Sequence, residues 1–199
     1  MNQSAKKQIS VKALVYIAVL GAMSAVLMVF KFPLPFAPPF MTVDIGDVGV
    51  MVSGFAFGPL AGVVTALVKI LINLLINGTT TGGVGELSNF IISSTFVIIA
   101  SLIYRRNKTK KNAILGLALG VLAYTAIACL SNYFVIFPLY GIDIKEFAKE
   151  FAAVNSLVSN SITFILFSIV PFNLVKGFLT SLVTIILYKP LSRFMKSNI

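Results

Sequence analysis

The sequence contains no histidine and no tryptophan, and it has a single cysteine, Cys129. The absence of histidine excludes a Ser-His-Asp triad, an HExxH zinc site and a haem histidine ligand. One cysteine can form neither an internal disulfide nor a Cys-x-x-Cys redox or metal motif. We therefore interpret Cys129, which lies in an apolar run, as a small packing residue, and we expect no catalytic and no metal site.

Charged residues are also scarce, and acidic residues are the scarcest. Charged side chains make up 11% of the 199 residues and only 6 of them are Asp or Glu, whereas 58% of the residues are hydrophobic. The mean hydropathy is +0.98. A soluble domain of this size cannot enclose so large an apolar fraction in one core. The chain is therefore predicted to be an all-α integral membrane protein, with a single transmembrane domain over residues 1–199.

Long apolar segments recur along the chain. A hydrocarbon layer about 30 Å thick needs roughly 20 apolar residues for one helical crossing. Segments of this kind begin near Val11, Val43, Pro59, Gly85, Ala113 and Ser161. We therefore predict six transmembrane helices. No A-x-A type cleavage site follows the first segment, so we expect it to be a retained span and not a signal peptide.

The 16 Lys and Arg residues give a net charge of +10, and their placement decides what that charge means. Short basic runs precede the first segment, separate the fourth from the fifth, and follow the sixth: Lys6, Lys7 and Lys12; Arg105, Arg106, Lys108, Lys110 and Lys111; Lys189, Arg193 and Lys196. They carry no interleaved aromatic residues, so we interpret them as orientation signals and not as a nucleic-acid surface. The positive-inside rule then predicts cytoplasmic N- and C-termini.

Two lysines lie inside apolar segments. Lys69 heads a stripe of polar residues at every fourth position, and Lys176 follows Asn173 by three positions, which puts an ammonium and a carboxamide on one helix face. A charge in lipid costs at least about 2.5–3.5 kcal/mol, so such side chains face protein or a wet cavity. We expect Lys69 to have a structural role and Lys176 to contact a ligand. The alternative for Lys176 is an ion pair with Asp44, Asp47 or Glu86.

Three other segments have local signatures. The stretch "KFPLPFAPPF", Lys31 to Phe40, has four prolines in ten residues and predicts a stiff external loop. The amphipathic pattern of residues 144–152 predicts a short helix lying on the membrane surface. Pro171 is predicted to interrupt the final span. In the first span, Ala18 and Ala22 form a small-residue strip that suits close approach of another helix, either a partner protein's or one of this chain.

Four motifs together carry a resemblance. "KFPLPFAPPFMTVDIGDVG", "FGPLAGVVTALVK", "SNYFVIFPLYG" and "PFNLVKG" occur in this order, and the chain resembles the riboflavin-binding S-components of energy-coupling factor (ECF) vitamin transporters, the RibU family. The "FGPLAG" turn is shared widely among S-components, whereas the proline-rich loop, "SNYF" and "PFNLVKG" point to the riboflavin branch. The resemblance covers nearly the whole chain.

The resemblance implies a six-helix fold in the bacterial plasma membrane that binds riboflavin from outside and needs no cofactor. It implies an ECF transmembrane coupling subunit and two ATP-binding subunits as partners, and we place the coupling contact on Ala18 and Ala22. Flavin contacts carry over to Asn132, Asn173 and Lys176. A carboxamide can both donate to and accept from the pyrimidine edge of the flavin. The candidates for apolar contact with the flavin ring are Phe40, Met41 and Tyr133. The candidates for hydrogen bonds to the ribityl hydroxyls are Thr42, Asp44 and Asn89.

Other functions stay open at this point. The same superfamily binds other cargos, so another vitamin or a flavin nucleotide is the first alternative. A stand-alone secondary carrier is the second, although the sequence lacks two matching inverted halves with broken helices. An intramembrane enzyme is disfavoured because no Ser-His or carboxylate-metal constellation is present.

Overall fold

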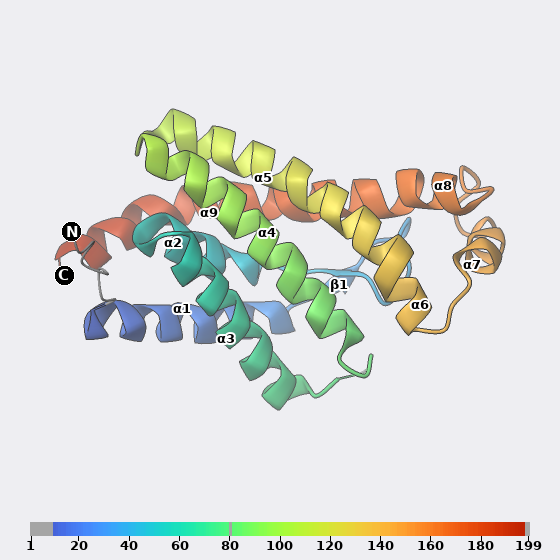
Figure 1. Ribbon diagram of the computed structural model, residues 1–199, viewed down its shortest axis with the longest axis horizontal. Coiled ribbons are helices and arrows are strands. Elements are labelled where there is room, and N and C mark those ends of the chain that lie inside the picture. The colour runs from blue at the N-terminus through green and yellow to red at the C-terminus, as the bar shows by residue number, and fades with distance from the viewer. Residues whose placement is uncertain (1–9, 80, 198–199) are drawn as a thin grey trace, which may run out of the picture.

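The computed structural model describes residues 10–79 and 81–197, with side chains as far as Pro190, and it shows a bundle of helices (Figure 1). The transmembrane-length helices are α1 (Val11–Val29), α3 (Pro59–Asn77), α4 (Val84–Arg106), α5 (Lys110–Ser131) and α9 (Val170–Ser197). The shorter elements are β1 (Phe32–Pro33), β2 (Thr42–Val43), α2 (Asp47–Phe57), the π-helical segment η1 (Asn132–Ile136), α6 (Phe137–Leu139), α7 (Ile144–Phe151), α8 (Ser161–Phe164) and the π-helical segment η2 (Ile165–Ile169). Helix α1 begins and α9 ends at the same end of the bundle.

Helix α2 is the centre of the bundle. It packs against α1, α3, α4 and α9, and every residue from Asp47 to Phe55 is buried. Glycine makes this packing possible, because a Cβ on Gly49 would lie 2.2 Å from Ser24 Oγ and 2.8 Å from the Leu20 carbonyl oxygen. The interior of the bundle is therefore built around a helix that has little or no contact with lipid.

The predicted second span differs from the structure for this reason. The sequence predicts a span from about Val43, but β2 lies there and α2 begins only at Asp47. Its 11 residues rise about 16 Å, roughly half the hydrocarbon thickness. Among the described residues, five helices are long and apolar enough to cross a membrane. A helix that is apolar on all sides can be buried in protein as well as in lipid, and composition does not distinguish the two.

The last span is continuous, so the predicted interruption at Pro171 is wrong. Proline lacks an N–H and its ring clashes with the carbonyl four residues earlier. Segment η2 ends two residues before Pro171, and η1 ends two residues before Pro138. The wider π turn accommodates each ring within the helix. The carbonyl of Phe167, four residues before Pro171, accepts a hydrogen bond from Asn155 Nδ2 at 3.2 Å.

The proline-rich loop and the amphipathic segment pack on the end of the bundle away from the first turn of α1 (Figure 1). The loop is non-helical as predicted, and its ends form an antiparallel pair in which Phe32 lies opposite Val43. Helix α7 forms where the pattern predicts it. Its apolar face packs on the protein and not on lipid, because the rings of Phe147 and Phe151 lie 5.5 and 5.4 Å from that of Phe164.

Two small-residue faces of α1 have different surroundings. A Cβ on Gly21 would lie 2.5 Å from Val68 of α3, and Ala25 is fully buried, so this face packs inside the chain. Ala18 is exposed and Ala22 is half-buried. The strip of Ala18 and Ala22 is therefore only partly covered by the described residues.

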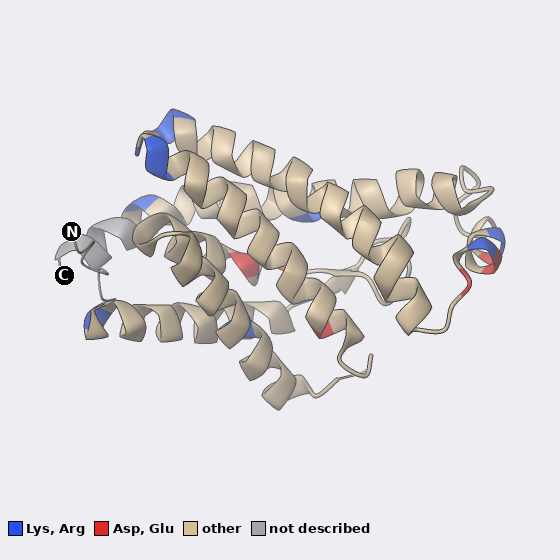
Figure 2. Ribbon diagram, in the orientation of Figure 1, with Lys and Arg blue, Asp and Glu red and all other residues tan. Residues whose placement is uncertain are grey.

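Basic residues gather at one end of the bundle. Figure 2 shows them where α1 begins, where α4 meets α5, and on α9 near the same end, with a further group on α7. Lys6 and Lys7 lie outside the described residues, as do the side chains of Arg193 and Lys196.

Candidate functional site

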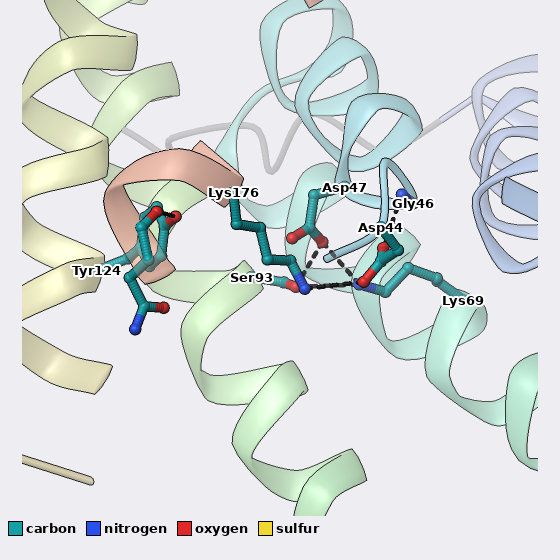
Figure 3. Close-up of polar contacts among 8 residues, drawn as sticks. Asp44, Gly46, Asp47, Lys69, Ser93, Tyr124 and Lys176 are labelled. Atoms are coloured by element: carbon teal, nitrogen blue, oxygen red, sulfur yellow. Dashed lines mark hydrogen bonds and ion pairs between the residues drawn. The ribbon is translucent and has the colours of Figure 1, made fainter. Parts of the chain in front are cut away.

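The first buried ion pair joins three helices. Lys69 Nζ of α3 donates to Asp47 Oδ1 of α2 at 2.6 Å and to Ser93 Oγ of α4 at 3.0 Å. Ser93 Oγ in turn donates to the same Asp47 oxygen at 2.5 Å (Figure 3). Lys69 is fully buried. This confirms the structural pairing that the sequence predicts for Lys69.

The second buried ion pair joins the first loop to the last span. Lys176 Nζ of α9 donates to Asp44 Oδ2 at 2.8 Å, and Asp44 Oδ1 accepts the backbone N–H of Gly46 at 2.8 Å (Figure 3). Asp44 thereby fixes the start of α2 against α9. An ammonium has three N–H donors, and Asp44 accepts one of them. Lys176 is 7% exposed, and that exposed part faces a cavity.

The cavity lies between the first loop, the α3–α4 turn, η1 and the start of α9, and it encloses about 180 Å³. One part of its lining is apolar and the other carries amides, hydroxyls and charges. The apolar part includes Phe40, Met41, Ile92, Ile136 and Phe172. The polar part includes Thr42, Asn73, Asn77, Glu86, Asn89, Asn132 and Lys176. Such a lining suits a flat apolar molecule with a hydrogen-bonding edge and polar substituents.

The structure brings most of the predicted site residues to this cavity. Phe40, Met41, Thr42, Asn89, Asn132 and Lys176 all line it. Asp44 lies one contact behind it, through its bond to Lys176. Tyr133 lines a separate cavity near Lys145 and Asn160.

The two predicted asparagines have matching local geometry. Asn132 Nδ2 donates to the Ala128 carbonyl at 2.7 Å, and Asn173 Nδ2 donates to the Ile169 carbonyl at 2.8 Å. Each bond reaches four residues back along the same helix and fixes the orientation of the carboxamide. Asn132 reaches the cavity surface, whereas Asn173 is buried behind it with 2% exposure.

Several lining residues were not predicted as site residues. Glu86 Oε2 accepts hydrogen bonds from the hydroxyls of Thr79 at 3.1 Å and Thr81 at 2.9 Å, which holds the α3–α4 turn beside the cavity. Asn73 and Asn77 belong to the polar stripe that starts at Lys69. Their four-residue spacing predicts that they share one helix face. The sequence alone does not show that this face lines the same cavity as Lys176.

Comparison with known proteins places the chain in a family. The family described as "ECF transporter, substrate-specific component" matches residues 12–188. The chain is 37% identical to the riboflavin transporter RibU of Staphylococcus aureus (strain TCH60), over 93% of each chain.

The chain belongs to the substrate-specific components of ECF transporters. It is 28% identical to the riboflavin transporter FmnP of Bacillus subtilis (strain 168), over 94% of this chain and 96% of that protein. A solved structure titled "Structure and mechanism of the S component of a bacterial ECF transporter" superposes with a TM-score of 0.75 at 36% identity, covering 93% of this chain and 98% of that one. This S-component is thus a multi-pass membrane transport protein and not an enzyme.

The buried pair of Lys69 and Asp47 generates a stability prediction. Lys69→Met leaves the Asp47 carboxylate buried without its cation, and we expect a loss of about 3–5 kcal/mol in the free energy of unfolding. The double variant Asp47→Asn/Lys69→Met removes both charges and recovers most of this loss. Thermal unfolding in detergent measures both effects. Lys145→Met, on the exposed face of α7, serves as control and stays within about 0.5 kcal/mol of wild type. A single variant as stable as wild type would contradict the structural role.

Proposed function

We propose that this S-component binds riboflavin in the cavity beside Lys176 and delivers it for ATP-driven uptake. The observation that carries the proposal is the lining itself, in which an apolar part faces a set of amides and the side chains of two lysines, Lys31 and Lys176. The relatives that match over almost the full chain are riboflavin transporters by name. In this proposal the partners are an ECF transmembrane coupling subunit and two ATP-binding subunits, in a bacterial plasma membrane.

The chemistry of the lining fits the parts of a flavin. The pyrimidine edge of the isoalloxazine has two carbonyls flanking an N–H, and a carboxamide such as that of Asn132 can donate and accept along it. Lys176 has donors beyond the one bound to Asp44 and can give one to a ring carbonyl or nitrogen. Phe40 and Met41 supply apolar contact to the ring. Thr42 and Asn89 lie where ribityl hydroxyls need polar partners.

Three residues predicted to contact the flavin do not line the cavity: Asn173, Asp44 and Tyr133. Asn173 lies one turn from Lys176 on α9, and we propose that its buried carboxamide supports the ring-binding side chains. Asp44 acts through Lys176, whose position it fixes. The contact of Tyr133 with the flavin stays a prediction, since its ring lines a neighbouring cavity.

The distribution of charge supports an orientation. The basic ends of α1, α4, α5 and α9 lie together, and the positive-inside rule assigns that end to the cytoplasm. The cavity is formed by the last turns of α1 and α3 and the first turns of α4 and α9, which are the opposite ends of these helices. We therefore propose cytoplasmic termini and a cavity that receives riboflavin from outside.

A ligand titration tests this function. The purified chain should carry or take up one riboflavin, seen as flavin absorbance that denaturation releases, and it should bind riboflavin at least as tightly as FMN. The carboxylate of Glu86 at the cavity repels a phosphate group, and Lys31, which lines the same cavity, offsets this repulsion without leaving a cluster of cations that would favour FMN. Thiamine at the same concentration serves as the control ligand. Much tighter binding of FMN, or no flavin binding, would overturn the assignment of cargo.

The dual role of Lys176 can be separated by substitution. Lys176→Met removes the ammonium, and we expect riboflavin affinity to fall by at least about tenfold, since a hydrogen bond from a charged donor is worth roughly 1.5–3 kcal/mol. The double variant Asp44→Asn/Lys176→Met relieves the unpaired carboxylate, so folding recovers while affinity stays low. If Lys176 is only structural, the double variant regains wild-type affinity. Asp47→Asn/Lys69→Met removes the other buried pair and serves as the control with retained binding.

The exposed strip on α1 is the proposed contact with the coupling subunit. Lipid gives no hydrophobic drive for helix association, so small residues that permit close backbone approach favour it. Ala18→Trp or Ala22→Trp should abolish riboflavin uptake by cells that express the whole transporter, while the isolated chain still binds riboflavin. Leu119→Trp, on the exposed face of α5, is the control and retains uptake. Uptake that survives both alanine substitutions would place the partner surface on another helix.

A further inference from the structure

A second cavity lies at the basic end of the bundle, far along the helices from the candidate riboflavin site. It encloses about 250 Å³ between the α4–α5 connection, the first turns of α5, Phe55 of α2 and the later part of α9. Three lysines line it: Lys108 from the α4–α5 connection, Lys110 from the first turn of α5, and Lys189 from α9. Figure 2 shows this group of basic residues where α4 meets α5.

Among the residues whose side chains the structure describes, none that lines this cavity is acidic. The chain has 6 acidic residues in all, and none lies between Glu86 and Asp143 or after Glu150. Lys108 and Lys110 therefore have no carboxylate neighbour in their own segment. The ammonium groups of Lys108 and Lys110 at one cavity repel each other, and an anion bound between them relieves that repulsion.

The backbone at the start of α5 adds to this positive potential. Thr109 is the N-cap residue, and its hydroxyl accepts the N–H of Asn112 at 3.2 Å. The first N–H groups of the 22-residue helix are directed toward the same end of the bundle, where a helix carries partial positive charge. The lysines and the helix terminus thus favour the same class of ligand group, a phosphate.

Most of the rest of the cavity lining is apolar and suits hydrocarbon, and the hydroxyls of Tyr104 and Tyr188 in it are hydrogen-bonded to each other. Phe55, Ala113 and Ile185 contribute aliphatic and aromatic surface, and the Phe55 and Tyr104 rings lie 4.7 Å apart. Ile114 lines the cavity and is also 45% exposed on the outer surface of α5, so the cavity continues onto the face where lipid chains lie. A small free anion gains nothing from these walls, whereas a phosphate with attached chains contacts both parts.

We propose that this cavity binds the phosphate headgroup of an anionic phospholipid, with an acyl chain along Ile114 and Ile185. Basic pockets between transmembrane helices are a known way for membrane proteins to hold such headgroups. This inference goes beyond vitamin binding and does not depend on the cargo. Under the proposed orientation the lipid belongs to the cytoplasmic leaflet.

Native mass spectrometry of the purified full chain tests the proposal. The chain is titrated with dioleoylphosphatidylglycerol and, separately, with dioleoylphosphatidylcholine, which has the same chains and no net charge. Lys108→Gln/Lys110→Gln removes two cations from the cavity. Arg106→Gln/Lys111→Gln removes two cations from the same connection without touching the cavity lining, and it is the matched control. An unchanged thermal unfolding midpoint in detergent shows that each variant is folded.

The expected result is one tightly bound phosphatidylglycerol per chain, with affinity reduced by at least about tenfold in the cavity variant and unchanged in the control variant. Inorganic phosphate and glycerol 3-phosphate should fail to displace the lipid at equal concentration. Equal weakening in both variants would show diffuse surface attraction and overturn the proposal. Displacement by inorganic phosphate would show a free-anion site, and equal binding of phosphatidylcholine would show that the lysines do not select the headgroup.

Discussion

Burying charge in an apolar bundle is the constraint on which the structure depends. Two lysines and two aspartates lie in the interior, and each ammonium has a carboxylate partner within 2.8 Å. The Asp47 pair ties α2 to α3 and α4, and the Asp44 pair ties the first loop to α9. Because an uncompensated buried charge is so costly, these pairs determine where the short central helix lies among the spans.

The candidate site is built on the same pairing. Asp44 compensates the charge of Lys176, which lets an ammonium stay in the cavity wall with two further N–H donors. The first loop contributes Phe40 and Met41 to the cavity lining, and the π-helical segment η1 contributes Asn132. One π segment before Pro138 and another before Pro171 keep these helices continuous.

Much of this arrangement could be predicted from sequence. The exceptions depend on how distant segments pack together, which local patterns do not show. Helices α1, α3 and α8 start at the predicted residues. Their starts depend on local signals, such as the capping residue Ser10, Pro59 at a first helical position, and the length of the apolar run. The prediction that Lys69 is paired or packed followed from its place in a polar stripe without aromatic residues. Its partner Asp47 is 22 positions away, and only the fold shows the pair. Helix α2 was predicted as a span because apolar composition is the same for lipid and for protein burial. Tyr133 was predicted as an aromatic contact for the ring; in the structure it lines a neighbouring cavity, because adjacent helical residues face different directions, and its contact with a flavin stays a prediction.

The most direct measurement of the central claim is a crystal structure of this S-component with riboflavin bound. The account predicts the isoalloxazine between Phe40 and Asn132, with Lys176 Nζ about 2.7–3.2 Å from a ring oxygen or nitrogen and still paired with Asp44. A flavin bound elsewhere in the bundle would contradict the account, as would a flavin in this cavity with Lys176 bonded to Asp44 alone.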